Sequence, residues 1–160
     1  MLIRPARRED HPAICTIIMP IIRAGETYAL DRDMSEDDAL AYWFGAEKET
    51  FVAEEGQTIV GTYYIRPNQA GGGRHVCNCA YVTLATATGR GVARHMCKHS
   101  LAHARSRGYR AMQFNFVVST NERAVGLWQS FEFQVVGRLP LAFNHPIHGY
   151  VDALVMFRSL

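Results

Sequence analysis

The fold of this chain is decided by residues 81–94, which read Tyr81-Val82-Thr83-Leu84-Ala85-Thr86-Ala87-Thr88-Gly89-Arg90-Gly91-Val92-Ala93-Arg94. A glycine-rich turn stands here between an apolar strand and the start of a long helix. Its glycines let the backbone approach a ligand closely, and the first N–H groups of a helix have no partner within it. These groups and the helix dipole attract an anion, and Arg90 and Arg94 add charge beside it. The turn therefore predicts a phosphate site.

Two common phosphate sites do not fit this turn. A Rossmann site places its glycines after an early strand and an acidic residue about 20 residues further on. This turn lies past the middle of the chain, and the following strand, AMQFNFVV, contains no acid. A P-loop ends in GK[ST], which is absent. A purely structural turn remains an alternative if this segment is considered alone.

The elements around the turn follow from apolar periodicity. We expect strands over residues 75–84 and 111–118, an amphipathic helix over 92–107 that ends at Gly108, and a second helix over 121–131. Two more strands complete the C-terminal part.

The N-terminal half begins with a short strand over residues 2–6. A helix starts near residue 9, and Pro20 is expected to kink or end it. Ser35, with Asp38 three residues later, resembles a capping box that opens a second helix. Strands over 50–54 and 58–65 follow, and the glycines within 68–73 predict a flexible loop.

The resulting order, βααβββαβαββ, predicts a single α/β domain over residues 1–160, an α+β mixed sheet with helices on both faces. A chain of 160 residues forms one sizeable core. The 17 basic and 15 acidic side chains offer no dense basic face for nucleic acid. No apolar run has the length of a membrane span or signal peptide, so we expect a cytoplasmic protein without a membrane partner.

Neither cysteine nor histidine predicts a metal site. Cys77 and Cys79 have no second pair to complete a zinc site, and we expect the four cysteines to be reduced. His95, His99 and His103 have helical spacing, but no carboxylate or thiol completes a ligand set. The expected metal content is none.

A second motif lies on the later helix, at Asn121-Glu122-Arg123-Ala124-Val125-Gly126-Leu127-Trp128-Gln129-Ser130-Phe131-Glu132-Phe133. Together with the turn it resembles the GNAT (GCN5-related N-acetyltransferase) superfamily. The turn of that family reads Arg/Gln-x-x-Gly-x-Gly/Ala, and its helix reads Asn-x-x-Ala-x-x-Leu-Tyr-x-x-x-Gly-Phe. The spacing and element order match over nearly the whole chain. The resemblance implies an N-acetyltransferase with acetyl-coenzyme A (acetyl-CoA) as cosubstrate.

The resemblance also implies which residues hold the cosubstrate. Backbone N–H groups of residues 90–94 would bind the pyrophosphate, the strand edge at 81–83 would pair with the pantetheine arm, and the later helix would add further contacts. The full implied set is Tyr81, Val82, Thr83, Thr88, Gly89, Arg90, Gly91, Val92, Ala93, Arg94, Asn121 and Trp128.

Three positions depart from the family pattern. Thr88 replaces the first Arg or Gln, which weakens one charge contact and leaves the backbone cradle. Glu132 replaces the Gly before Phe133, a change in turn geometry. Trp128 replaces the Tyr that often protonates the departing thiolate, and an indole cannot act as that acid.

Shorter stretches resemble fungal acetyltransferases that act on proline analogues such as azetidine-2-carboxylate. They include His75-Val76-Cys77-Asn78, Phe114-Asn115, Val136-Gly137-Arg138 and Gly149-Tyr150-Val151-Asp152-Ala153. The likeness implies an amino acid or proline analogue as acceptor. Phosphinothricin and methionine-sulfone acetyltransferases are the nearby alternative. The missing Tyr also leaves open a non-catalytic acyl-CoA-binding module.

The acceptor residues are the least constrained by the sequence. Asn78 lies mid-strand on an apolar face, where its amide needs a partner, either a substrate or the neighbouring backbone. Tyr28, Asn78 and Asn115 are the expected substrate contacts. Asn78 and Glu26 are the expected catalytic residues, with Glu26 accepting the proton of the amine, although a solvated surface charge is an equal alternative. The partner is a small-molecule amine, and a homodimer is the family habit.

Overall fold

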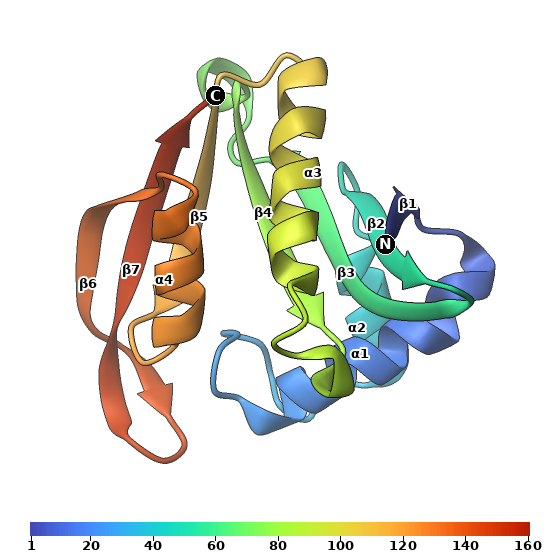
Figure 1. Cartoon of the computed structure of the whole chain (residues 1–160). Helices are drawn as coiled ribbons and strands as arrows, with labels where there is room; N and C mark the ends of the chain where they lie inside the picture. Colours follow the sequence, from blue (N-terminus) through green and yellow to red (C-terminus); the bar gives the residue numbers. More distant parts are fainter.

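Seven strands form one sheet in the order β1-β2-β3-β4-β5-β7-β6 in the computed structural model, which describes residues 1–160 (Figure 1). The strands are β1 (Leu2–Pro5), β2 (Glu49–Glu55), β3 (Thr58–Pro67), β4 (Val76–Thr83), β5 (Ala111–Val118), β6 (Gln134–His145) and β7 (Gly149–Ser159). The helices are α1 (His11–Ala24), α2 (Glu36–Trp43), α3 (Val92–Ser106) and α4 (Glu122–Ser130). This order confirms the predicted βααβββαβαββ arrangement.

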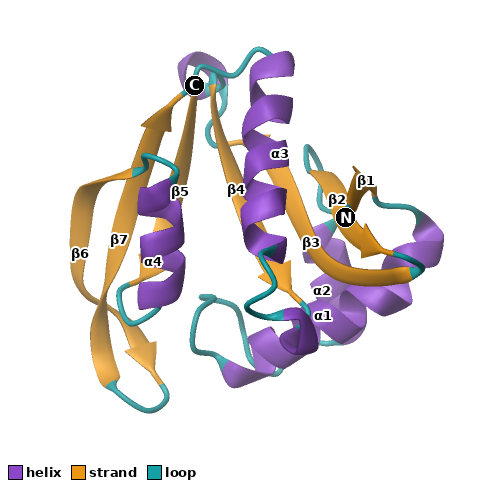
Figure 2. Cartoon of the chain, in the orientation of Figure 1, coloured by secondary structure: helices purple, strands orange, loops and turns teal.

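Helices cover both faces of the sheet, as Figure 2 shows. One core cluster joins α3 and α4 to the sheet through residues such as Met96 and Trp128. A second cluster joins α1 and α2 to the opposite face through residues such as Ile14 and Trp43. Successive side chains of β4 alternate between the two clusters because a strand has a period of two. Each large apolar side chain buried in this way contributes about 1.5–3 kcal/mol.

The start of α3 lies directly on β3, and Gly61 makes this possible. A Cβ atom at Gly61 would come within 2.8 Å of the Val92 side chain. The absent side chain therefore lets the first turn of α3 approach the sheet. This contact fixes the position of the glycine-rich turn relative to the strands.

The two central strands separate soon after they meet. Parallel pairing between β4 and β5 is limited to Val76 with Ala111 and Cys77 with Met112, and the two ribbons then diverge (Figure 1). On its other side, β5 pairs with β7 in antiparallel fashion, with a bulge between Phe114 and Val117. The sheet therefore has a wedge-shaped opening at its centre.

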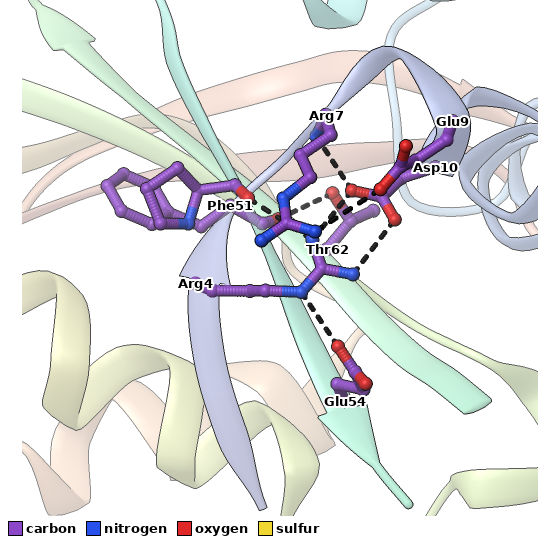
Figure 3. Close-up of polar contacts among 8 residues, drawn as sticks. Arg4, Arg7, Glu9, Asp10, Phe51, Glu54 and Thr62 are labelled. Carbon is purple, nitrogen blue, oxygen red and sulfur yellow. Dashed lines mark hydrogen bonds and ion pairs between the residues drawn. The ribbon is translucent and has the colours of Figure 1, made fainter. Parts of the chain in front are cut away.

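An ion-pair network holds β1 against the start of α1 (Figure 3). The Arg4 guanidinium donates to both oxygens of Asp10 at 2.7 and 2.9 Å, and its Nε donates to Glu54 at 2.7 Å. The backbone N–H of Arg7 also donates to Asp10 at 2.7 Å. These bonds, led by those from Arg4, lower the pKa of the buried Asp10 carboxyl. The N-terminal strand is thereby tied to both α1 and β2.

Two expectations need correction. Helix α1 continues through Pro20 to Ala24 and ends at Gly25, whose φ of 64° is left-handed. Pro20 is exposed, while Met19 and Ile22 on either side of it are buried, so packing outweighs the lost backbone hydrogen bond. The triple glycine forms one 3-10 turn over Gly71–Gly73.

Three further expectations are confirmed, namely the Ser35 cap, the Gly108 stop and the unpaired state of the cysteines. The Ser35 side chain caps α2 by accepting the Asp38 N–H, and Gly108 follows α3 with a φ of 81°. All four cysteines are free and buried. None of the helices combines the length and apolarity that a membrane crossing requires.

Candidate functional site

A cleft of about 740 Å³ occupies the opening between β4 and β5. The start of α3, the start of α4 and the segment after α1 complete its walls. It is lined by Asn78, Tyr28 and Asn115, and by every predicted cosubstrate residue except Arg90. The structure therefore brings together residues that are up to about 100 positions apart in sequence.

The glycine-rich turn offers a cradle of unpaired donors. Gly89 and Gly91 have φ angles of 87° and 81°, which glycine adopts without strain. The backbone N–H groups that have no partner in the protein are those of Gly89, Gly91, Val92, Ala93 and Arg94. These groups stand at the positive end of α3 and fit a diphosphate.

Arg90 differs from its expected role. Its N–H donates to the Ala87 carbonyl at 3.3 Å, and its guanidinium pairs with Glu55 on β2. It does not line the cleft. Arg94 does line the cleft and is steadied there by a 3.1 Å bond to Ser130.

Arg123 is a cleft residue that the sequence reasoning missed. It lies in the first turn of α4, and its Nη2 comes within 3.4 Å of the place where a Gly89 Cβ would stand. Its position two residues after the motif residue Asn121 was the available signal. Arg94 and Arg123 together make this end of the cleft cationic.

The edge of β4 presents backbone groups to the cleft. The Tyr28 hydroxyl donates to the Tyr81 carbonyl at 2.9 Å. Tyr81 lies opposite Tyr63 of the antiparallel β3, and in such a pair the N–H and C=O of one residue point to the same side. Since Tyr28, a cleft residue, donates to the Tyr81 carbonyl, the Tyr81 N–H on the same side of the strand also faces the cleft.

Asn78 stands where β4 and β5 part. Its Nδ2 donates to the Gln113 carbonyl at 2.9 Å, one residue beyond the last parallel pair, Cys77 with Met112. The side chain thus replaces the next backbone rung between the strands. Because its nitrogen faces a carbonyl, the amide oxygen is the atom left without a partner, and it is free to accept from a ligand.

Three amide side chains, two on β5 and one beside it, form a short hydrogen-bonded chain. Gln113 donates to Asn115 at 2.8 Å, and Asn115 donates to Asn68 at 2.7 Å. Asn115 lies at the bulge of β5. Its bond to Asn68, in the loop after β3, holds its side chain at the cleft wall. Its amide oxygen and nitrogen are both engaged.

The two residues implied on and before α4 have structural partners. Asn121 caps α4 by accepting the Ala124 N–H at 3.3 Å, which leaves its amide nitrogen unbonded. The Trp128 ring is buried, with centroids 5.0 Å from both Tyr81 and Phe114. Trp128 therefore contributes an apolar wall.

The far end of the cleft is aromatic. Tyr42 and Tyr64 line it, and their hydroxyls lie 3.2 Å apart. The Lys48 ammonium lies over both rings, at 3.6 and 4.1 Å from their centroids. Burial, with the charge of Arg66 adding to it, lowers the pKa of Lys48 to about 8. Burial raises the pKa values of Tyr28 and Tyr64 far above their usual range.

No carboxylate, imidazole or ammonium lines the cleft; its charged side chains are Arg66, Arg94 and Arg123. Glu26, the expected proton acceptor, is exposed and lies outside the lining although Thr27 and Tyr28 belong to it. The turn after α1 directs Glu26 to solvent. Arg66, on β3, was not expected; strand alternation and its place opposite Asn78 would have revealed it.

Comparisons with known proteins agree with this geometry. The model of the Acetyltransferase (GNAT) family matches residues 15–133. N-acetyltransferase aca1 of Schizosaccharomyces pombe is 28% identical over 151 residues, covering 84% of this chain and 72% of that protein. A GCN5-related N-acetyltransferase from Kribbella flavida superimposes with a TM-score of 0.94 at 42% identity, covering 99% of this chain and 97% of that one.

A more distant structure shares the fold alone. It is a phosphinothricin acetyltransferase from Sinorhizobium meliloti in complex with AcCoA, with a TM-score of 0.85 at 18% identity, covering 99% of this chain and 88% of that one.

Proposed function

The chain belongs to the Acetyltransferase (GNAT) family and is an N-acetyltransferase that uses acetyl-CoA, and from this premise we propose that it acetylates the amino group of a small amino acid or proline analogue. The observation that carries the proposal is the aromatic, cationic end of the cleft beside Asn78. Tyr28, Tyr42 and Tyr64 enclose this end, which suits a small acceptor better than a peptide. The stretches similar to proline-analogue enzymes support the same class.

The cosubstrate supplies an acetyl group activated as a thioester. In our proposal the unpaired N–H groups of residues 89 and 91–94 hold its pyrophosphate, with Arg94 and Arg123 beside them. The Tyr81 N–H faces the cleft and would stabilise the carbonyl oxygen as it gains charge. The free amide oxygen of Asn78 would accept a hydrogen bond from the acceptor amine. Catalysis then depends on alignment and on preorganised donors.

No carboxylate, imidazole or ammonium lines the cleft to receive the proton of the amine. The hydroxyls of Tyr28, Tyr64 and Tyr81 stay protonated because burial raises their pKa values. We therefore propose that the acceptor loses its proton to water before or during attack. As the tetrahedral intermediate collapses, the C–S bond of the thioester breaks and the coenzyme A thiolate takes its proton from water, because the indole of Trp128 cannot act as the acid.

This proposal predicts the pH dependence of the rate. Only the neutral amine attacks, so kcat/KM should rise with pH, with its midpoint at the pKa of the acceptor amine, and level off above it. Acceptors with different amine pKa values should shift the midpoint accordingly. Burial lowers the pKa of Lys48, which lies beside the cleft, to about 8, so the profile of Lys48→Met serves as the control. A midpoint that stays fixed for all acceptors would show an enzyme base instead.

The acceptor class is tested by thiol release with acetyl-CoA. The panel contains azetidine-2-carboxylate and proline, phosphinothricin and methionine sulfone, a polyamine, and a peptide with a free N-terminus. Mass spectrometry confirms each acetylated product. We expect the highest kcat/KM for a small amino acid, and preference for the peptide or polyamine would contradict the proposal.

We also propose that the β6–β7 hairpin forms a homodimer interface. Six of the eight exposed large hydrophobic side chains lie on it: Val135, Val136, Leu139, Leu141, Ile147 and Tyr150. Between residues 134 and 150 the only fully charged side chain is Arg138, which pairs with Asp152 at 2.6 Å. A nearly uncharged apolar patch can face its own copy without like-charge repulsion, which suits a two-fold interface.

The homodimer is tested by light scattering after gel filtration. The wild type should have twice the 18.0 kDa mass of the chain, and the double variant Val136→Asp/Ile147→Asp should be monomeric. Leu2→Asp is the control, since Leu2 is 59% exposed and lies at the other edge of the sheet. A monomeric wild type, or a double variant that stays dimeric, would contradict the assignment.

A further inference from the structure

Arg66 on β3 is a cation without a partner. Its Nε is buried and makes no hydrogen bond, and none of its nitrogens takes part in an ion pair. Arg4, in the same sheet, shows the usual pattern, with every nitrogen of its guanidinium bonded to Asp10 or Glu54. A buried guanidinium nitrogen without a hydrogen-bond acceptor costs folding free energy. The Nε of Arg66 therefore calls for an acceptor from a bound ligand.

The surroundings of Arg66 offer no anion. The cleft that it lines contains no Asp or Glu, and Lys48, whose pKa the charge of Arg66 helps to lower, is a second cation in its vicinity. Glu47, adjacent to Lys48 in sequence, is paired with Arg74 at 2.7 Å. The positive charge of Arg66 is therefore available to a bound molecule.

The position of Arg66 separates it from the cosubstrate phosphates. Arg66 is the direct cross-strand partner of Asn78, so both side chains leave the sheet on the same face, with Cβ atoms about 5 Å apart. From Asn78 to Thr83, where β4 ends, is five residues, or about 17 Å of strand. The pyrophosphate turn begins only beyond that point. An anion at Arg66 consequently belongs to the acceptor.

We propose that Arg66 determines acceptor specificity by binding a carboxylate of the acceptor, while Asn78 binds its amine. A guanidinium matches a carboxylate with two parallel hydrogen bonds. The short separation of Arg66 and Asn78 suits an amine and a carboxylate on the same or adjacent carbon atoms, as in an α-amino acid. This inference rests on the proposed amino acid acceptor and names the residue that selects it.

The test compares an acid with its uncharged amide. Azetidine-2-carboxylate and azetidine-2-carboxamide are titrated calorimetrically into the protein saturated with coenzyme A, and both are assayed by thiol release. The wild type should bind the acid about 10- to 150-fold more tightly than the amide, and Arg66→Ala should abolish this preference. KM for the acid should rise while kcat changes little, and Arg66→Lys should retain part of the preference.

Arg74→Ala is the matched control, since Arg74 follows the same strand but is exposed and paired with Glu47. It should behave as the wild type, and the affinity of Arg66→Ala for acetyl-CoA should be unchanged. Equal binding of acid and amide by the wild type, no binding of the acid, or a preference that survives Arg66→Ala would overturn the inference. If the enzyme acetylates the acid and the amide equally well, the proposed role of Arg66 is wrong, but the proposed acceptor class can still hold. If the panel shows preference for a peptide or polyamine, the proposed acceptor class fails.

Discussion

Replacing Gly91 with valine is expected to lower the affinity for acetyl-CoA by at least about 100-fold, the equivalent of two lost charge-assisted hydrogen bonds. Gly91 caps α3 with a φ of 81°, and the unpaired N–H groups at and after it form the anion cradle. A β-branched residue does not adopt this backbone conformation without strain, so the turn must rearrange. Isothermal calorimetry with acetyl-CoA measures the loss directly.

Gly108→Val provides a control for the strain itself. Gly108 also has a φ of 81°, lies just beyond the other end of α3, and has open space around its missing Cβ. Both variants should lose a similar amount in melting temperature, but only Gly91→Val should lose cosubstrate affinity. Normal affinity in Gly91→Val, or an equal loss in Gly108→Val, would place the pyrophosphate elsewhere.

Replacing Asn78 with alanine is expected to lower kcat/KM for the acceptor by about 100-fold, because small displacements of a reacting group have effects of this size. The variant removes both the free amide oxygen and the bond from Nδ2 to the Gln113 carbonyl. The unpaired carbonyl should also cost about 1–3 kcal/mol of stability. Steady-state kinetics with varied acceptor, alongside thermal melting, separates the two effects.

Cys77→Ala is the matched control for stability. Cys77 is fully buried, bonds across the same strand pair to the Ala111 carbonyl, and does not line the cleft. It should lower the melting temperature without changing acceptor kinetics, whereas acetyl-CoA affinity should be nearly intact in both variants. A folded Asn78→Ala variant with unchanged acceptor kinetics would refute a substrate role for Asn78.

Much of the fold was predictable because its signals are local. Helix starts, glycine stops and the strand-turn-helix around residues 81–94 each depend on a few neighbouring residues. Pro20 was misjudged because the burial of the residues around it is a tertiary property. The parting of β4 and β5 after two pairs was likewise outside the reach of sequence patterns, since it depends on how α4 and β7 position β5.

The site was predictable where it is made of backbone and less so where it is made of side chains. The glycines of the turn predict backbone N–H groups without a partner, and the structure has such groups at the start of α3. Arg90 was expected in the cradle because it stands between the glycines, yet Glu55 from a distant strand pairs with it. Glu26 points to solvent. Arg66 can be recognised as a candidate site residue only from the structure, which shows that its buried Nε has no hydrogen-bond partner.

The most direct test of the account is a crystal structure of the protein with coenzyme A and the preferred acceptor. We predict that the pyrophosphate lies within hydrogen-bonding distance of the N–H groups of residues 91–94. The thiol should lie between β4 and β5, near the Tyr81 N–H, and the acceptor amine should contact the Asn78 amide oxygen. A coenzyme bound outside this cleft, or an acceptor that reaches the thiol without approaching Asn78, would contradict it.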